Sequence, residues 1–95
     1  MAFPQKPTVF TQLVKAGTGA EATVAVPQGC NHFTMTSDGG TTRHAPATGT
    51  VATGTPTYNG STRTFADPNM AGRTLYVLSP VGTTAYFDFF YASGV

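Results

Sequence analysis

Residues 84–91 read Thr84-Ala85-Tyr86-Phe87-Asp88-Phe89-Phe90-Tyr91, and this stretch decides the fold class. Successive side chains of a β-strand point to opposite faces of a sheet. One face is therefore predicted to carry Ala85, Phe87, Phe89 and Tyr91, and the other Tyr86, Asp88 and Phe90. We expect the first face to fill one side of a sandwich core. Its rings should pack there against Leu75, Val77, Val24 and Val26.

The rest of the chain predicts further short strands separated by turns. The candidate strands are residues 8–14, 21–26, 30–36, 55–58, 61–65 and 73–79, and residues 41–56 are expected to hold one weak edge strand and a loop. Residues 73–79 are apolar on both faces, which is typical of a central strand. No segment has helical spacing. The sequence thus predicts an all-β fold, a small antiparallel β-sandwich or jelly-roll-like barrel of about seven to eight short strands.

Asn59-Gly60 is the strongest local turn signal in the chain. This pair favours a two-residue type I′ turn, in which both central residues need positive φ, and so predicts a hairpin over residues 57–64. Pro56 has no N–H to donate to a neighbouring strand. It should therefore place the first strand of this hairpin at a sheet edge.

Pro4 and Pro7 favour extended backbone in the first seven residues. We therefore predict an extended N-terminal arm at residues 1–7 and a single β-sandwich domain at residues 8–95. The arm lacks the apolar stretch of a signal peptide, and the apolar run 85–92 is too short to span a bilayer. We expect a soluble protein, made in a cytoplasm, that has no membrane partner.

Charge is sparse along the whole chain. Five Lys and Arg and four Asp and Glu make up 9% of its 95 residues, and the formal net charge is +1. Such a balance gives no electrostatic reason to expect nucleic acid as a partner. A threonine-rich surface with little charge offers little repulsion between molecules. This composition suits a protein that packs against copies of itself or against a larger particle.

Candidate catalytic and metal-binding groups are few. Cys30 and His32 would share a strand face, with His44 and Asp38 nearby in sequence, and such a set could bind zinc or copper. Paired ligands such as C-x₂-C are absent, however, and a lone cysteine is usually a buried thiol. The serines lack a G-x-S-x-G motif, and the four acidic residues are dispersed. We expect no catalytic, cofactor-binding or metal-binding residue and no enzymatic activity.

Tyr86 and Phe90 have no predicted place in the core. Exposed together, they would form a larger apolar patch than monomers usually tolerate, so we expect a second subunit to bury them. The predicted interface residues are Phe3, Pro4, Pro7, Tyr86 and Phe90. A cleft in which rings stack on sugar is the alternative. A platform for single-stranded nucleic acid is disfavoured because residues 84–91 contain no Lys or Arg.

The proline-containing arm, the low-charge Thr/Gly/Ala body, the hairpin predicted at residues 57–64 and the aromatic strand 84–91 resemble small virion proteins of tailed bacteriophages, particularly head decoration (cement) proteins. The resemblance implies a β-rich body, often trimeric, that docks on the capsid lattice and stiffens it. It implies a virion location, with further copies of the chain and a major capsid protein or other virion protein as partners. The alternative function is a carbohydrate- or receptor-binding module of a phage tail or fibre. The lack of Trp weakens this alternative, although four tyrosines could supply the stacking rings.

Overall fold

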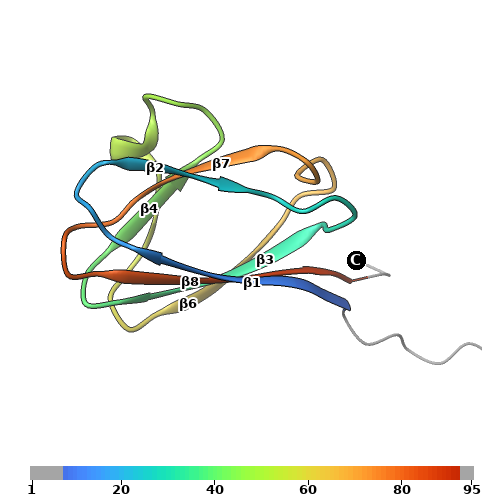
Figure 1. The fold of residues 1–95 in the computed structure, drawn as a ribbon, viewed down its shortest axis with the longest axis horizontal. Coiled ribbons are helices and arrows are strands. Elements are labelled where there is room, and N and C mark those ends of the chain that lie inside the picture. Colours follow the sequence, from blue (N-terminus) through green and yellow to red (C-terminus); the bar gives the residue numbers. More distant parts are fainter. Residues whose placement is uncertain (1–7, 93–95) are drawn as a thin grey trace, which may run out of the picture.

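The computed structural model of this protein describes residues 8–92, which form two four-stranded antiparallel sheets packed face to face (Figure 1). Eight strands follow one another as β1 Thr8–Ala16, β2 Glu21–Ala25, β3 His32–Asp38, β4 Thr42–Ala45, β5 Thr55–Thr57, β6 Thr62–Ala66, β7 Thr74–Leu78 and β8 Thr84–Tyr91. A single 3₁₀ turn among the described residues, η1 Val51–Thr53, precedes β5. The prediction of an all-β sandwich is confirmed.

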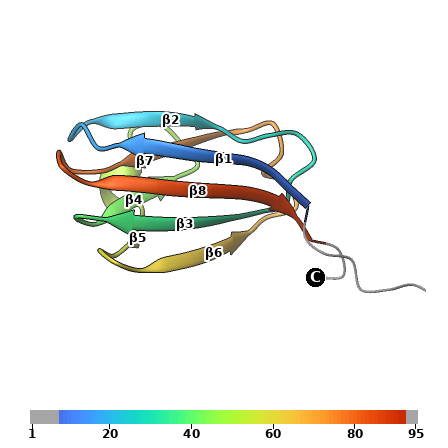
Figure 2. The same ribbon diagram turned by 60° about the horizontal axis from the view of Figure 1, so that its bottom comes forward.

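The order of the strands is that of a jelly roll. Sheet A is ordered β1-β8-β3-β6 and sheet B is ordered β2-β7-β4-β5. Apart from β4 and β5, every pair of consecutive strands lies in opposite sheets, so the chain crosses the sandwich at almost every turn. Figure 2 shows sheet A with its strands side by side in front of sheet B. Strand β7 is central in sheet B, as its two apolar faces predicted.

The core lies between the two sheets and contains most of the predicted residues. Phe87 and Phe89 are fully buried, and the residues packed with them include Val24, Val26, Met35, Leu75 and Val77. The position predicted for Tyr91 is wrong, because its side chain is exposed. Tyr91 ends β8 opposite Thr8, the first residue of β1, at the margin of sheet A. The last residue of a strand at the margin of a sheet can be exposed even when it lies on the core-facing side, because few neighbouring residues cover it there.

The hairpin predicted at Asn59-Gly60 is also wrong. Strand β5 pairs with β4 in sheet B, whereas β6 pairs with β3 in sheet A, so the turn joins the two sheets. No non-glycine residue in the described part of the chain has positive φ, while Gly60 has a φ of 77°. The Ser61 N–H donates to the Tyr58 carbonyl at 2.9 Å. Positive φ at the third residue alone is typical of a type II turn rather than type I′.

Gly60 gives a direct test of this turn. An added Cβ would meet no atom within 4 Å, so the cost of a substitution comes from the backbone conformation alone. We expect Gly60→Ala to lower the free energy of unfolding by about 1 kcal/mol, because alanine resists left-handed backbone. Gly60→Asn is the matched control and should cost less, since asparagine tolerates that conformation. If the wild type and both variants had the same free energy of unfolding in urea, the positive φ assigned to residue 60 in this turn would be wrong.

Residues 41–56 hold more structure than one weak edge strand. Strand β4 pairs with both β5 and β7 and is therefore an inner strand of sheet B. Its Thr42 and Ala45 are buried, and Val51 of η1 is buried beside it. Small and hydroxyl side chains give a weak apolar pattern, although neighbouring strands bury them. Pro56 lies on the edge strand β5, which confirms the edge position predicted for it.

Each of the four edge strands carries a charge or a proline. These residues are Lys15 on β1, Glu21 on β2, Pro56 on β5 and Arg63 on β6. Charges and prolines on edge strands hinder pairing with the edge of another sheet. The edges of this sandwich are therefore poorly suited to strand-to-strand association, which leaves its faces and loops as contact surfaces.

Candidate functional site

The outer face of sheet A is the first candidate surface. Figure 2 shows the four strands β1, β8, β3 and β6 of this sheet side by side, and their side chains that alternate away from the core form its outer face. Val14 and Tyr86 stand directly opposite each other on β1 and β8 and are 61% and 44% exposed. A large aliphatic side chain and a tyrosine ring thus form one exposed apolar pair on this face.

Threonines extend this surface from the apolar pair to the edge of the sheet. Thr36 faces Tyr86 on one side and Thr62 on the other, and the Thr36 and Thr62 hydroxyls lie 2.7 Å apart. Thr34 and Thr64 form the next row, with their hydroxyls 3.4 Å apart. Cross-strand threonine pairs of this kind order the side chains of a sheet face. The result is a hydroxyl-rich surface beside the Tyr86 ring.

Phe90 takes a different position from Tyr86. Its ring stacks on the imidazole of His32, with centroids 5.1 Å apart, and it is half-buried. His32 itself is buried and contacts the Asn31 side chain through Nδ1. The predicted pair of exposed rings on β8 is therefore one exposed ring, Tyr86, and one ring packed against a histidine. Phe3, Pro4 and Pro7 lie outside the described residues.

Acidic residues are the charged side chains on the described part of this face. Asp88 lies in its middle, between Gln12 of β1 and Thr34 of β3, and Asp38 lies at the end of β3. Burial of the Asp88 carboxylate against a partner needs a hydrogen-bond donor from that partner, because an unpaired buried charge is costly. The face therefore favours a partner that offers an apolar area together with a donor.

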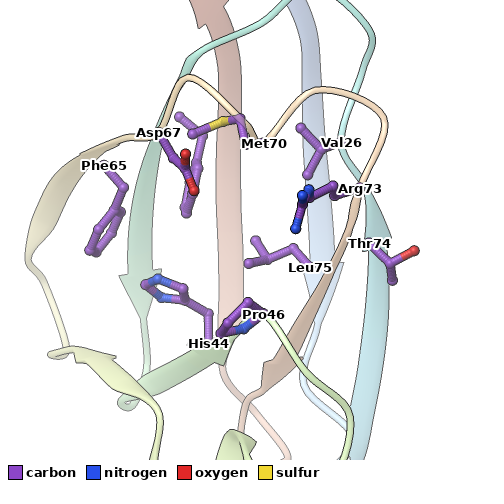
Figure 3. A pocket seen from close by; sticks show the side chains of 10 residues that line it. Val26, His44, Pro46, Phe65, Asp67, Met70, Arg73, Thr74 and Leu75 are labelled. Atoms are coloured by element: carbon purple, nitrogen blue, oxygen red, sulfur yellow. The ribbon is translucent and has the colours of Figure 1, made fainter.

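A cavity at the open side of the sandwich is the second candidate site (Figure 3). It has a volume of about 230 Å³ and lies between β6 of sheet A and β4 and β7 of sheet B. Its walls are apolar and are formed by Val26, Phe33, Phe65, Met70 and Leu75. Two exposed residues of opposite charge, Asp67 and Arg73, lie at its rim. We call this cavity the Phe65 pocket.

Three rings shape the wall of the Phe65 pocket. Phe65 stacks on Phe33, with centroids 5.0 Å apart, and meets the imidazole of His44 edge-on at 4.4 Å. The guanidinium of Arg63 lies 5.1 Å from the centre of the Phe65 ring. Arg63 Nη1 also donates to the Pro56 carbonyl at 2.7 Å and so joins β6 of sheet A to β5 of sheet B. The cation–π contact and the ring contacts together hold the Phe65 side chain in the wall of the pocket.

His44 contributes an uncharged wall to this pocket. Burial, together with the nearby positive charge of Arg63, lowers its pKa to about 4. Its Nδ1 atom is buried and has no hydrogen-bond partner. The imidazole is consequently neutral at physiological pH and contributes an aromatic surface.

A shallow hollow around Tyr58 forms a third surface. It has a volume of about 410 Å³ and is lined by Gly19, Thr41, Arg43, Tyr58, Leu78 and Pro80. The Tyr58 ring is 59% exposed. Arg43 Nη1 donates to the Gly54 carbonyl at 3.1 Å, which holds the guanidinium on this side of sheet B. An exposed ring next to a fixed donor is an arrangement that can hold a sugar.

The set of metal ligands considered from the sequence is not brought together. Cys30 points into the core, where its Sγ contacts the Pro27 carbonyl, whereas His32 stacks on Phe90 on the outer side. The expectation that Cys30 and His32 share a face is wrong, because Cys30 precedes β3 and does not follow its alternation. Burial raises the pKa of the Cys30 thiol, which keeps it protonated. Within residues 8–92 no three His, Cys, Asp or Glu side chains lie close enough to hold a metal ion.

Two of the serine hydroxyls have structural partners. Ser37 and Ser79 are buried and both hydrogen-bond to the Thr42 hydroxyl, at 2.9 and 2.8 Å. This chain of hydroxyls joins the turns at one end of the sandwich. Ser37 and Ser79 therefore stabilise the junction between the two sheets.

No family model matches this chain, and neither a curated protein nor a solved structure is significantly similar to it. None of the helices in the described part of the chain is long and apolar enough to cross a membrane. The residues of the Phe65 pocket had no signal in the sequence. They come from β3, β4, β6, β7 and the loops that follow β2, β4 and β6, and their proximity depends on how the two sheets are stacked.

Proposed function

We propose that this protein is a homo-oligomeric structural protein of a bacteriophage virion, a capsid decoration protein that works by burying surface against its partners. The outer face of sheet A carries this proposal. It combines the exposed Val14 and Tyr86 pair with ordered threonines, and its described residues include no Lys or Arg. Interface centres are enriched in aromatic residues, and a hydrogen-bond donor of the partner would pair with Asp88 in the middle of this face.

The charged and proline residues on the four edge strands support association through the faces of the sheets rather than through their edges. Lys15, Glu21, Pro56 and Arg63 hinder the addition of a strand from another molecule at any of the four edges. A flat face can still pack against a partner, and repetition of weak contacts across a lattice gives strong retention. Jelly rolls occur in viral capsid proteins, a likeness of fold that by itself does not fix function.

A substitution on this face tests the proposal. Tyr86→Glu places a third acidic group between Asp88 and Asp38 without touching the core. We expect sedimentation analysis to show association weakened by about 30-fold or more, the loss typical of a central interface tyrosine. Attachment to purified capsids should fall with it, while the melting temperature stays close to that of the wild type.

Tyr58→Glu is the matched control, because Tyr58 is a similarly exposed tyrosine on another surface. It should leave both association and capsid attachment unchanged. A full-length protein that sediments as a monomer at high concentration and ignores capsids would contradict the proposal.

The second candidate function is carbohydrate binding, and the hollow around Tyr58 favours it. The exposed ring and the fixed Arg43 guanidinium could hold a sugar by stacking and hydrogen bonding. A glycan array with the wild type and Tyr58→Glu distinguishes the two functions. Glycan binding that Tyr58→Glu abolishes and Tyr86→Glu retains would support this second function over assembly.

A further inference from the structure

The Phe65 pocket has the size and chemistry of a receptor for one aromatic side chain. Its volume is about 230 Å³, and a cavity of roughly 150 Å³ lined by apolar side chains is large enough to bind benzene. Phe33, Phe65, Met70 and Leu75 offer it apolar walls, and the neutral His44 adds no charge. A phenylalanine ring fits these walls in both volume and polarity.

One segment of this chain outside the described residues carries such a ring. The arm at residues 1–7 contains Phe3, next to Pro4. Proline-rich segments bind grooves lined by aromatic residues because they lose little conformational freedom on binding. Phe3 therefore offers an apolar ring to the pocket, and Pro4 restricts the backbone beside it, so that less conformational freedom is lost on binding.

The described part of the chain begins, at Thr8, at the end of sheet A where the pocket opens. Thr8, the first residue of β1, faces Tyr91 of β8. The Asn31 N–H donates to the Phe90 carbonyl, and the Asp67 N–H donates to the Asn31 carbonyl at 2.9 Å. Paired backbone segments thus run without a gap across this end of sheet A, from the start of β1 to Asp67. Asp67 lies at the rim of the pocket.

The reach of the arm favours a second copy over the pocket of the same chain. Asp67 lies three strand spacings from Thr8, about 14 Å across the sheet. Phe3 lies five residues before Thr8 and reaches at most about 17 Å when fully extended. Little length remains for the chain to turn back and enter its own pocket, and Pro4 and Pro7 disfavour such a reversal. A neighbouring molecule has no such restriction.

We propose that Phe3 of one copy binds in the Phe65 pocket of a second copy. This inference rests on the proposed homo-oligomeric function, and it names one specific contact that would hold the copies together. The arm and the pocket are different surfaces, so each copy gives one contact and accepts another. Head-to-tail contacts of this kind close into rings when the rotation between copies allows it.

Disulfide trapping between full-length chains tests the contact. One chain carries Ala2→Cys in the arm, and a second, distinguishable by mass, carries Arg73→Cys at the pocket rim. Val81→Cys is the matched control, because Val81 is 79% exposed on the turn between β7 and β8, away from the pocket. The native Cys30 is buried and does not compete.

We expect mixed disulfides between Ala2→Cys and Arg73→Cys well above the Val81→Cys level. Adding Phe3→Ala to the arm should reduce them to that level and weaken association about tenfold or more, as loss of a buried phenylalanine side chain implies. Phe3→Leu should retain part of the effect. No trapping in a protein that still sediments as an oligomer would overturn the contact and leave the proposed function in place.

Two further outcomes would also overturn it. A chain that carries both cysteines and closes only on itself would show that the arm binds its own pocket. A monomeric protein with no trapping would overturn the contact together with the proposed function, which sedimentation of the wild type reveals independently.

Discussion

Replacing Phe87 with alanine is expected to lower the free energy of unfolding by about 3–5 kcal/mol, the usual cost of removing a fully buried ring. Phe87 is 1% exposed and lies on β8, the strand that pairs with both β1 and β3. It contacts the rings of Phe33 and Phe89, with centroids 6.2 and 6.0 Å away. Its neighbours cannot collapse fully into the space it leaves, because the Phe33 and Phe89 rings are themselves packed in the core on β3 and β8.

Urea denaturation and thermal melting both measure this loss. A domain of this size should melt roughly 15 °C lower or more. The control is Tyr86→Ala, one residue earlier on the same strand but on the outer face. It should cost less than about 1 kcal/mol, as is usual for exposed positions. Similar losses in the two variants would contradict the burial pattern of β8.

The second large effect is a loss of stability in acid that depends on His44. Its pKa is about 4 in the folded protein and 6.5 when unperturbed. Between these values the unfolded chain binds the proton more strongly than the folded protein. Stability is therefore complete above about pH 6.5, falls as the pH drops toward 4, and is fully reduced below that. The shift sets an upper limit of about 3 kcal/mol, and partial solvation of the imidazole reduces this to about 1–2 kcal/mol.

Unfolding free energies of the wild type and His44→Phe between pH 4 and 7 isolate this contribution. Phenylalanine keeps a ring against Phe65 and removes both the titrating group and the buried, unpartnered Nδ1. We expect the variant to be at least as stable as the wild type at pH 7 and to lose the His44 part of the pH slope. The same slope in both proteins would show that other groups cause it. Glu21 titrates lower, since the Thr48 hydroxyl and the Gly49 N–H hold its pKa below the usual value.

The parts of the fold that could be predicted from the sequence are those that follow from the alternation of apolar and polar residues within one strand. The pattern of residues 84–91 correctly placed Phe87 and Phe89 in the core and Tyr86 outside it. The two apolar faces of residues 73–79 correctly indicated a central strand, and Pro56 correctly marked an edge. These features depend on single strands, and the period of two acts within each strand whatever its neighbours are.

Which strands pair with one another could not be predicted from the sequence. Asn59-Gly60 was predicted to close a hairpin, but β5 and β6 lie in different sheets. A jelly roll sends consecutive strands to opposite sheets, and short-range turn signals do not record this choice. Strand β4 was missed as an inner strand because its residues are small or polar and are buried only by β5 and β7.

The sequence alone therefore determined the fold class, the core face of β8 and the scarcity of charge, because each follows from composition or from the period of one strand. Only the tertiary structure decided which strands pair and which residues meet in the Phe65 pocket. It also decided that Phe90 stacks on His32 while Tyr86 stays exposed. These features join residues that are far apart in the chain, and such contacts arise when the two sheets stack.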